Sequence, residues 1–210
     1  MQFIYGLSKS GISLAKYLNK KNESFNCWDD DQKVRQQVKK ILKNAKLINP
    51  KKNNLDRYDK IYVSPGISIR KKNYLKIKNY KIKVARDLNL YWHKIVNQKL
   101  VAVTGTNGKS TTTKLIGEIF MNSNLSTFVG GNIGTPLFDS FLNKEKYTHH
   151  VIELSSFQLE LIKNFNPTVS ILLNLSKDHL DRYNNFRDYI NQKKKIFSSN
   201  SLGFNIISVD

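Results

Sequence analysis

The sequence predicts an α/β protein of two domains, each built on a parallel β-sheet. Short β-branched and aromatic runs alternate with stretches of helical periodicity along the whole chain. Two of these runs lead through a glycine-containing turn directly into a helix, at residues 6–11 and 105–108. The length of 210 residues is enough for two domains that each bury a core. We expect the boundary between residues 97 and 98, so that the domains are 1–97 and 98–210.

The expected elements alternate in the order typical of such sheets. Strands are expected at residues 3–5, 24–28, 46–48, 60–63, 81–84, 100–104, 126–129, 150–153, 168–174 and 204–209. Helices are expected at residues 12–18, 32–42, 71–79, 86–96, from 109 onward, and at 185–198.

The composition is that of an ordinary globular protein, with 40% hydrophobic residues. No apolar run has the length of a membrane span and the chain opens on a strand-like run, so we expect neither a membrane segment nor a signal peptide. The single cysteine, Cys27, cannot form an internal disulfide, which fits a reducing compartment, and its apolar surroundings predict a core position. A cytoplasmic location is therefore expected.

Lysine dominates the charge, since 35 Lys and Arg against 16 Asp and Glu give a formal net charge of +19. A nucleic-acid-binding module is one explanation, and it would show a steep salt dependence of binding. However, the basic residues are spread along the chain without an arginine-rich arm, and they accompany abundant Asn and Ile, as AT-rich coding produces. We expect no nucleic-acid partner.

The first domain begins as a Rossmann-like unit. Its first turn imitates the dinucleotide fingerprint G-x-G-x-x-G, with Ser8 in place of the middle glycine. The second strand ends in Asp29, Asp30 and Asp31, where such units contact a ribose hydroxyl. A helix N-cap is the alternative interpretation of this acidic run, and both can hold. The fourth strand ends in the sharp turn Ser64-Pro65-Gly66, on the sheet edge where ligands of parallel sheets bind.

The second domain begins as a P-loop ATPase-type unit. Gly105 and Gly108 allow successive backbone N–H groups to face an anion at a helix N-terminus. Lys109 would then reach the outer phosphates of a nucleotide, and Ser110 or Thr111 would offer a hydroxyl to Mg²⁺. Thr104 stands where the general pattern has its first glycine. The alternative is an ordinary helix start.

Three later segments carry candidate functional groups. The glycines of residues 130–134 require special backbone geometry or close approach to a ligand. Glu153 ends a buried strand opposite the loop, where a carboxylate can hold Mg²⁺ directly or through water. Asp178 and His179 follow the next strand and suggest a second metal or phosphate contact, although a lone histidine is more often structural. The lysine run 193–195 is most simply a solvated helix face.

With these motifs the sequence resembles the Mur ligases of peptidoglycan synthesis, and among them the ligases that add D-glutamate. The motifs are Gly105-Thr-Asn-Gly-Lys-Ser-Thr111, Gly130-Gly-Asn-Ile-Gly134, Glu153-Leu-Ser-Ser-Phe-Gln-Leu-Glu160, Asp178-His-Leu-Asp-Arg-Tyr183 and Ser64-Pro-Gly66. The phosphate-loop motif is shared with sister Mur ligases and folylpolyglutamate synthases, which remain alternatives. The resemblance implies an ATP-dependent acid–D-amino-acid ligase that joins D-glutamate to UDP-N-acetylmuramoyl-L-alanine through an acyl phosphate.

The resemblance also implies roles for particular residues. The ATP contacts would be Gly105, Thr106, Asn107, Gly108, Lys109, Ser110 and Thr111. The residues that serve two Mg²⁺ ions would be Ser110, Glu153, His179 and a carbamylated Lys193, and Lys109, Glu153, His179 and Lys193 would be the catalytic set. The substrate contacts would be Leu7, Ser8, Asp29, Asp30, Ser64, Pro65, Gly66, Asn132, Ser155 and Arg182.

Two departures from the family pattern matter. Ser8 replaces a loop glycine and Asp31 stands where some members carry a basic residue, so the uridine contacts transfer less directly than the ATP contacts. The likeness covers the N-terminal domain and most of the central domain, while the family's third domain is absent. We therefore expect a truncated chain, monomeric and inactive alone in ligation, with a catalytically incomplete nucleotide-binding fragment as the alternative.

Overall fold

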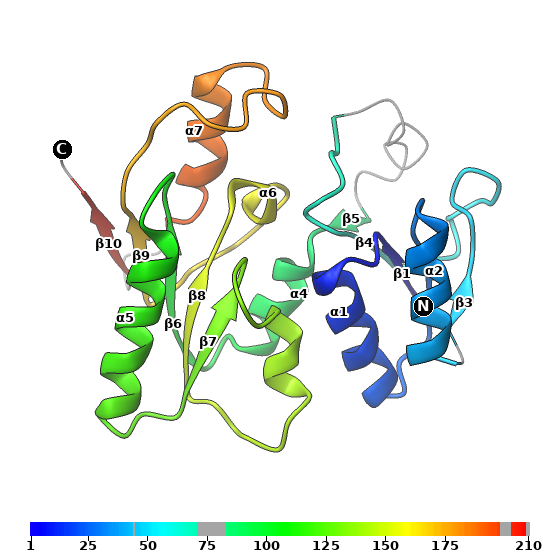
Figure 1. The fold of residues 1–210 in the computed structure, drawn as a ribbon, viewed down its shortest axis with the longest axis horizontal. Coiled ribbons are helices and arrows are strands. Elements are labelled where there is room, and N and C mark those ends of the chain that lie inside the picture. The colour runs from blue at the N-terminus through cyan, green and yellow to red at the C-terminus, as the bar shows by residue number, and fades with distance from the viewer. Residues whose placement is uncertain (44, 71–82, 198–202, 209–210) are drawn as a thin grey trace. The chain divides into compact units, whose positions relative to one another are not determined.

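The computed structural model describes residues 1–43, 45–70, 83–197 and 203–208, and it divides the chain into two compact units, Met1–Asp87 and Leu88–Asp210. Each unit is a mixed α/β structure around one five-stranded sheet, and the strand pairs of both sheets are parallel (Figure 1). The prediction of a parallel sheet in each half is confirmed.

The first unit has the strand order β3-β2-β1-β4-β5. Its elements are β1 (Gln2–Tyr5), α1 (Lys9–Lys20), β2 (Phe25–Trp28), α2 (Gln32–Ile41), β3 (Lys46–Leu47), β4 (Lys60–Val63) and β5 (Val84–Ala85). The chain proceeds outward from β1 in one direction and then returns to place β4 on the other side of β1. Strand order therefore reverses between β1 and β4, which is where doubly wound sheets open a crevice at the carboxyl ends of their strands.

Two features that the sequence predicts for the first unit are present in the structure. Cys27 is fully buried in β2, so its predicted core position is confirmed. The Asp31 carboxylate accepts a hydrogen bond of 2.7 Å from the amide of Lys33 and caps α2, as predicted. The predicted helix at 71–79 lies outside the described residues, as do the first two residues of the predicted strand at 81–84.

The second unit has the strand order β10-β9-β6-β8-β7. Its elements are α4 (Asp87–Lys94), which begins at the unit boundary, β6 (Lys99–Thr104), α5 (Lys109–Asn122), β7 (Thr127–Gly131), the 3-10 helix η2 (Leu137–Phe141), β8 (His149–Glu153), α6 (Ser156–Leu159), β9 (Val169–Leu172), α7 (Phe186–Lys194) and β10 (Phe204–Ile207). Helix α5 covers one face of the sheet, with Ile116 and Phe120 against the valines of β6 and β8.

Strand β6 and its two neighbours form the centre of this sheet. Leu100 to Val103 are nearly or fully buried. Successive side chains of a strand point to opposite faces, and in a parallel sheet covered on both sides each face is apolar. β6 pairs with β8 on one side and with β9 on the other. The carboxyl ends of these three strands consequently lie side by side.

The boundary between the units lies ten residues before the predicted one, at Asp87 and Leu88 rather than at 97 and 98. Helix α4 accounts for the difference, because its apolar face packs within the second unit. The Trp92 indole donates 2.8 Å to the carbonyl of Asn164, and the Asn89 amide donates 3.1 Å to the carbonyl of Leu161. Among the described residues, no helix combines the length and apolar character required to cross a membrane.

A buried histidine ties α4 to the sheet. His150 in β8 is 1% exposed, and its Nδ1 lies 2.6 Å from the Tyr91 hydroxyl while Nε2 contacts the side-chain oxygen of Gln98. The amide oxygen can only accept, so Nε2 carries the proton and Nδ1 accepts from Tyr91. Both ring nitrogens are therefore paired in the neutral form. Burial, with a smaller contribution from His149, lowers the pKa of His150 from 6.5 to about 4.

We predict that acid destabilises the second unit through His150. Because its pKa is lower in the folded state, the unfolded chain takes up the proton first as the pH falls below about 6.5, and stability declines until about pH 4. Between pH 7 and pH 5 the expected loss is about 2 kcal/mol. Urea unfolding followed by Trp92 fluorescence in a Trp28→Phe background measures it. The loss should shrink in His150→Gln and persist in His149→Gln, and an equal loss in all three chains would contradict the assignment.

Candidate functional site

The candidate site lies at the carboxyl ends of β6, β8 and β9. The loop of residues 105–108 follows β6, Glu153 ends β8, and Asn174 stands two residues beyond the end of β9. This is the edge at which parallel α/β sheets bind ligands. The strand order thus gathers residues that are up to about 70 positions apart in the sequence.

The loop has the backbone geometry that its glycines predict. Gly108 adopts a left-handed conformation, with φ of +79°, and is the N-cap of α5. Having no side chain, it provides no capping acceptor for the first turn of α5. The N–H groups of that turn, with the positive end of the helix dipole, consequently form a surface suited to an anion.

Glu153 is the carboxylate of the site and is 1% exposed. The Ser110 hydroxyl donates to its Oε2 at 2.7 Å, and the Asn132 side-chain amide donates to its Oε1 at 2.9 Å. A buried carboxylate requires such partners. Because the hydroxyl proton points to Glu153, the lone pairs of Ser110 Oγ remain available to a cation. The structure therefore brings together the three predicted residues Ser110, Asn132 and Glu153.

Two lysines donate to carbonyls of the loop. Lys109 Nζ lies 2.7 Å from the carbonyl of Thr106, and Lys193 Nζ lies 2.6 Å from that of Gly105. Lys193 is 2% exposed, whereas Lys194 and Lys195 are exposed. The solvated position expected of the lysine run 193–195 is therefore found for Lys194 and Lys195 and is wrong for Lys193. Burial, reinforced by the cation of Lys109, lowers the pKa of Lys193 to about 8.

His179 stands at the border of the site with a left-handed φ of +52°. Its Nε2 lies 3.3 Å from Asp178, and its ring packs against Phe157 of α6, with 4.8 Å between centroids. The Arg182 guanidinium lies 3.9 Å from the centroid of Phe157. The described residues contain no group of three or more His, Cys, Asp or Glu arranged for a metal ion. His179 and Glu153 are thus not gathered into one ligand cluster of this kind.

Ser155 has a structural task in addition to any predicted contact. It is the N-cap of α6, its hydroxyl accepts from the Gln158 amide at 3.3 Å, and the Gln158 side chain accepts from the Ser155 amide at 3.0 Å. This capping box orients the short helix that carries Phe157. Its signature, Ser-x-x-Gln after a strand, was readable in the sequence.

Three residues that the sequence analysis did not single out hold the loop. Asn174 binds the backbone of Thr106 and Asn107, with its Oδ1 2.8 Å from the Asn107 amide. The Tyr189 hydroxyl of α7 lies 3.1 Å from the Thr106 hydroxyl, which also accepts 3.0 Å from the Ser176 amide. The available signal for Asn174 was its place just after a buried strand, the same signal that identified Glu153.

In the first unit, the predicted substrate residues collect at the carboxyl ends of β1, β2 and β4. The Asp29 carboxylate accepts from the amides of Leu7, at 2.7 Å, and Asp31, at 2.9 Å. Asp30 accepts from the Tyr5 hydroxyl at 2.7 Å and from the Trp28 indole at 3.1 Å. Asp29 therefore joins the turn after β1 to the chain after β2, because one oxygen binds the Leu7 amide and the other binds the Asp31 amide.

The turn that contains Ser64, Pro65 and Gly66 is braced from two sides. The Ser64 hydroxyl donates 2.5 Å to the carbonyl of Gly6, which joins this turn to the one after β1, the turn that carries Leu7 and Ser8. The fully buried Arg86 guanidinium donates to the carbonyls of Val63, Ser64 and Ile67, at 2.7 to 3.3 Å. These bonds fix the main chain of the turn, while Gly66 is exposed and a Cβ added to it would meet no described atom within 4 Å.

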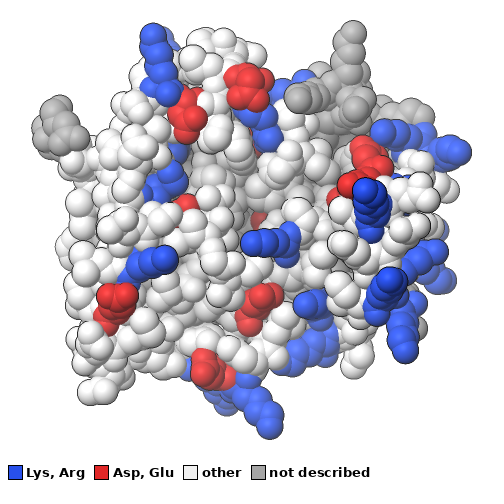
Figure 2. All heavy atoms as spheres, in the orientation of Figure 1, with Lys and Arg blue, Asp and Glu red and all other residues white. Residues whose placement is uncertain are grey.

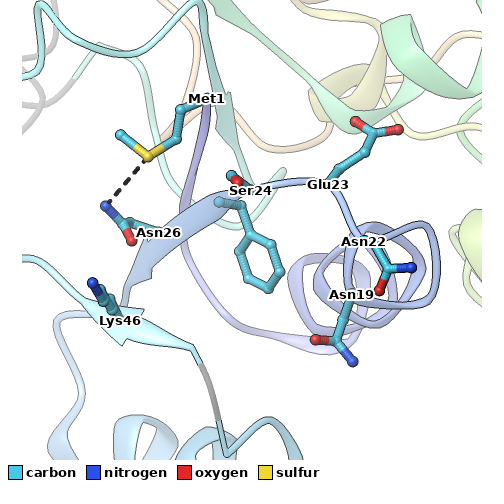
Figure 3. Close-up of a pocket in the computed structure, with 8 residues that line it drawn as sticks. Met1, Asn19, Asn22, Glu23, Ser24, Asn26 and Lys46 are labelled. Atoms are coloured by element: carbon cyan, nitrogen blue, oxygen red, sulfur yellow. Dashed lines mark hydrogen bonds between the residues drawn. The ribbon is translucent and has the colours of Figure 1, made fainter.

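A hollow of about 360 Å³ opens at the opposite edge of the first sheet (Figure 3). It is lined at the amino ends of β1 and β2 by Met1, Asn19, Asn22, Glu23, Ser24, Phe25, Asn26 and Lys46. None of the predicted site residues lines it.

Two family models match the chain. The Mur ligase MurD-like, N-terminal domain matches residues 1–86, and the Mur ligase middle domain matches residues 103–210, just over half of the chain. The chain belongs to the Mur ligase family. The second match covers the loop, Glu153, His179 and Lys193.

Two relatives of the chain share the same name. It is 37% identical over 201 residues to the UDP-N-acetylmuramoylalanine--D-glutamate ligase of Wolbachia pipientis, covering 95% of this chain and 39% of that one. It is 40% identical over 194 residues to the enzyme of the same name from Rickettsia prowazekii, covering 92% and 43%. The chain thus spans less than half the length of these relatives.

A solved Mur-type structure shares the fold. The murein peptide ligase mpl from Psychrobacter arcticus superimposes with a TM-score of 0.56 at 17% identity, covering 99% of this chain and 48% of that one. This likeness supports the fold of a Mur ligase and, at this identity, nothing finer.

We predict that Gly131→Ala is far more destabilising than Gly134→Ala. A Cβ at residue 131, where φ is +111°, would lie 2.3 Å from the carbonyl oxygen of Glu153, so we expect a loss of about 3 kcal/mol. At residue 134, where φ is +57° and the space is open, the expected loss is about 1 kcal/mol. Urea denaturation of the two variants measures this, and equal losses would show that the contact between β7 and Glu153 is not tight.

Proposed function

We propose that this chain provides the substrate-binding and nucleotide-binding domains of an ATP-dependent ligase that adds D-glutamate to UDP-N-acetylmuramoyl-L-alanine. The observation that carries the proposal is the buried Glu153, bonded to the Ser110 hydroxyl beside a left-handed glycine turn at the start of α5. The names of the relatives and the match to the MurD-like N-terminal model support the choice of D-glutamate and of the muramoyl substrate.

The second unit is proposed to bind ATP in its P-loop. The amides of residues 108–111 face the phosphates, and Lys109 leaves the carbonyl of Thr106 to contact the outer phosphate oxygens. Gly105, Thr106 and Asn107 form the preceding wall of the loop. The cost of this rearrangement is small, because one hydrogen bond of the lysine replaces another.

The oxygen donors of the site fit Mg²⁺. The Ser110 hydroxyl, the Glu153 carboxylate and the neighbouring Asn132 offer the hard ligands that this ion prefers. When bound, Mg²⁺ neutralises charge that develops on the transferred phosphoryl group. His179 and a carbamylated Lys193 are proposed to serve a second ion.

The chemistry requires activation of a carboxylate. Transfer of the terminal phosphoryl group of ATP to the L-alanine carboxylate gives an acyl phosphate and ADP. The free amine of D-glutamate then attacks the acyl carbon, loses a proton and displaces inorganic phosphate. The proposed task of this chain is to orient the carboxylate toward the phosphate and to stabilise its charge. Asn132, Ser155 and Arg182 are the proposed contacts of the acyl end.

The uridine end of the substrate is proposed to bind the first unit, at the point where its strand order reverses. Leu7, Ser8, Asp29, Asp30 and the turn of residues 64–66 lie at this edge, and hydrogen bonds fix the main chain of the two turns there. The proposed partners are the small-molecule substrates alone, for a monomer in the cytoplasm.

A nucleic-acid interface has less support. Figure 2 shows basic side chains over the visible face that are separated by acidic and uncharged groups rather than joined in one stripe. A stripe along one element is the arrangement expected of a protein that tracks a phosphate backbone.

The proposal predicts that Lys109→Ala lowers the affinity for ATP with Mg²⁺ about 10- to 100-fold, because a hydrogen bond to a charged group contributes about 1.5–3 kcal/mol. Calorimetric titration measures this. Lys114→Ala, an exposed position on the same helix, is the matched control and should bind like the wild type. Unchanged affinity in Lys109→Ala would contradict the assignment of the loop.

A second prediction concerns Lys193. In a form of the protein that ligates, Lys193→Ala should lose activity and regain part of it when a small carboxylate such as formate is added, since the carboxylate replaces the proposed carbamate. Lys194→Ala should retain activity in either condition. Full activity of Lys193→Ala without added carboxylate would exclude the carbamate.

A further inference from the structure

Asn174 contacts the loop through both ends of its side-chain amide and through its main chain. Its Oδ1 accepts from the amides of Thr106, at 3.2 Å, and Asn107, at 2.8 Å, and its Nδ2 donates 3.1 Å to the carbonyl of Asn107. Its main-chain carbonyl accepts 3.0 Å from the Thr106 amide. The amide of this half-buried side chain thus pairs with the N–H and C=O groups of Asn107, as a main-chain peptide group would.

We propose that Asn174 is a positioning residue for nucleotide binding, which it serves by fixing the first half of the loop so that only the amides from Gly108 onward face the phosphates. The inference rests on the proposed function in so far as the anion is a nucleotide. Asn174 itself does not touch the ligand.

The division of the loop follows from hydrogen-bond geometry. The amides of Thr106 and Asn107 are bonded to Asn174, so they are not available to an anion at the helix end. The next residue, Gly108, turns the chain with its left-handed φ and begins α5. The hydrogen bonds of Asn174 to Thr106 and Asn107, here called the clamp, therefore end where the helix N-terminus begins, and they hold the first half of the loop through the protein's own groups. Binding then avoids the free energy that ordering a flexible loop costs.

The chemistry selects asparagine. The side chain must accept two N–H bonds with one atom and donate to a carbonyl with the other. An aspartate retains the acceptor but places a second oxygen against the carbonyl of Asn107. Alanine removes both functions.

The clamp also couples the loop to the segment that leads to His179. Ser176 donates to the Thr106 hydroxyl, and the Tyr189 hydroxyl lies 3.1 Å from the same atom. Displacement of residues 174–176 would consequently displace the loop.

Amide hydrogen exchange of the nucleotide-free chain tests the clamp directly. Thr106 has two acceptors on Asn174, one of them main chain, whereas the contact of the Asn107 amide is with the side chain. In Asn174→Ala, exchange of the Asn107 amide should rise at least about 10-fold while that of Thr106 changes little. Asn174→Asp should keep Asn107 protected. Asn143→Ala, an exposed amide bonded to Tyr147, is the control and should change neither.

Titration with ATP and Mg²⁺ on the same proteins tests the positioning role. Asn174→Ala should bind about 10-fold more weakly than the wild type and Asn143→Ala should bind equally. Faster exchange of Asn107 without loss of affinity would overturn the role in binding, and unchanged exchange would overturn the clamp. If the wild-type chain binds no nucleotide, the proposed function fails, and the exchange rate of Asn107 still decides whether Asn174 orders the loop.

Discussion

The buried carboxylate of Glu153 is the constraint on which the candidate site depends. A charge at 1% exposure is tolerated only where hydrogen bonds replace its hydration, and here the donors come from two other segments, Ser110 in α5 and Asn132 after β7. The requirement therefore fixes the start of α5 and the glycine turn of residues 130–134 around the end of β8. Gly131 permits this approach, since any side chain there would meet the main chain of Glu153.

The loop of residues 105–108 is held by a second set of contacts, which do not involve Glu153. Asn174, Tyr189 and Lys193 contact its main chain or the Thr106 hydroxyl, and all three belong to the segment after β9. The central position of β6 between β8 and β9 is what allows both sets of contacts at once. An edge strand would have offered one neighbour and left half of the loop unsupported.

Much of this arrangement was predictable from the sequence. Three predicted buried strands lead to Gly-Thr-Asn-Gly-Lys-Ser, to Glu153 and to Asp178-His179. Because the carboxyl ends of parallel strands lie at the same edge of a sheet, these residues could be assigned to one edge before the strand order was known. Cys27 and the Asp31 cap followed from local pattern in the same way. Family resemblance selected Lys193 from a run of three lysines, and burial distinguishes it from Lys194 and Lys195.

Other features could not be predicted, because they depend on which strands are neighbours. The bond of Ser110 to Glu153 and the clamp of Asn174 join residues 43 and about 70 positions apart. The boundary shifted to Asp87 because the burial of α4 depends on partners such as Asn164 and His150, which its own periodicity does not identify. For Asp29, local pattern indicated a ligand contact, and the structure shows that both carboxylate oxygens bind main-chain amides.

The most direct test of the proposed nucleotide site is a crystal structure of the chain with a non-hydrolysable ATP analogue and Mn²⁺, which takes the place of Mg²⁺ and is located by its anomalous scattering. We expect a manganese peak bonded to Ser110 Oγ, with Glu153 bound to it directly or through one water, and the outer phosphates over the amides of residues 108–111. Nucleotide bound elsewhere, with Glu153 still bonded only to Ser110 and Asn132, would contradict the proposed site.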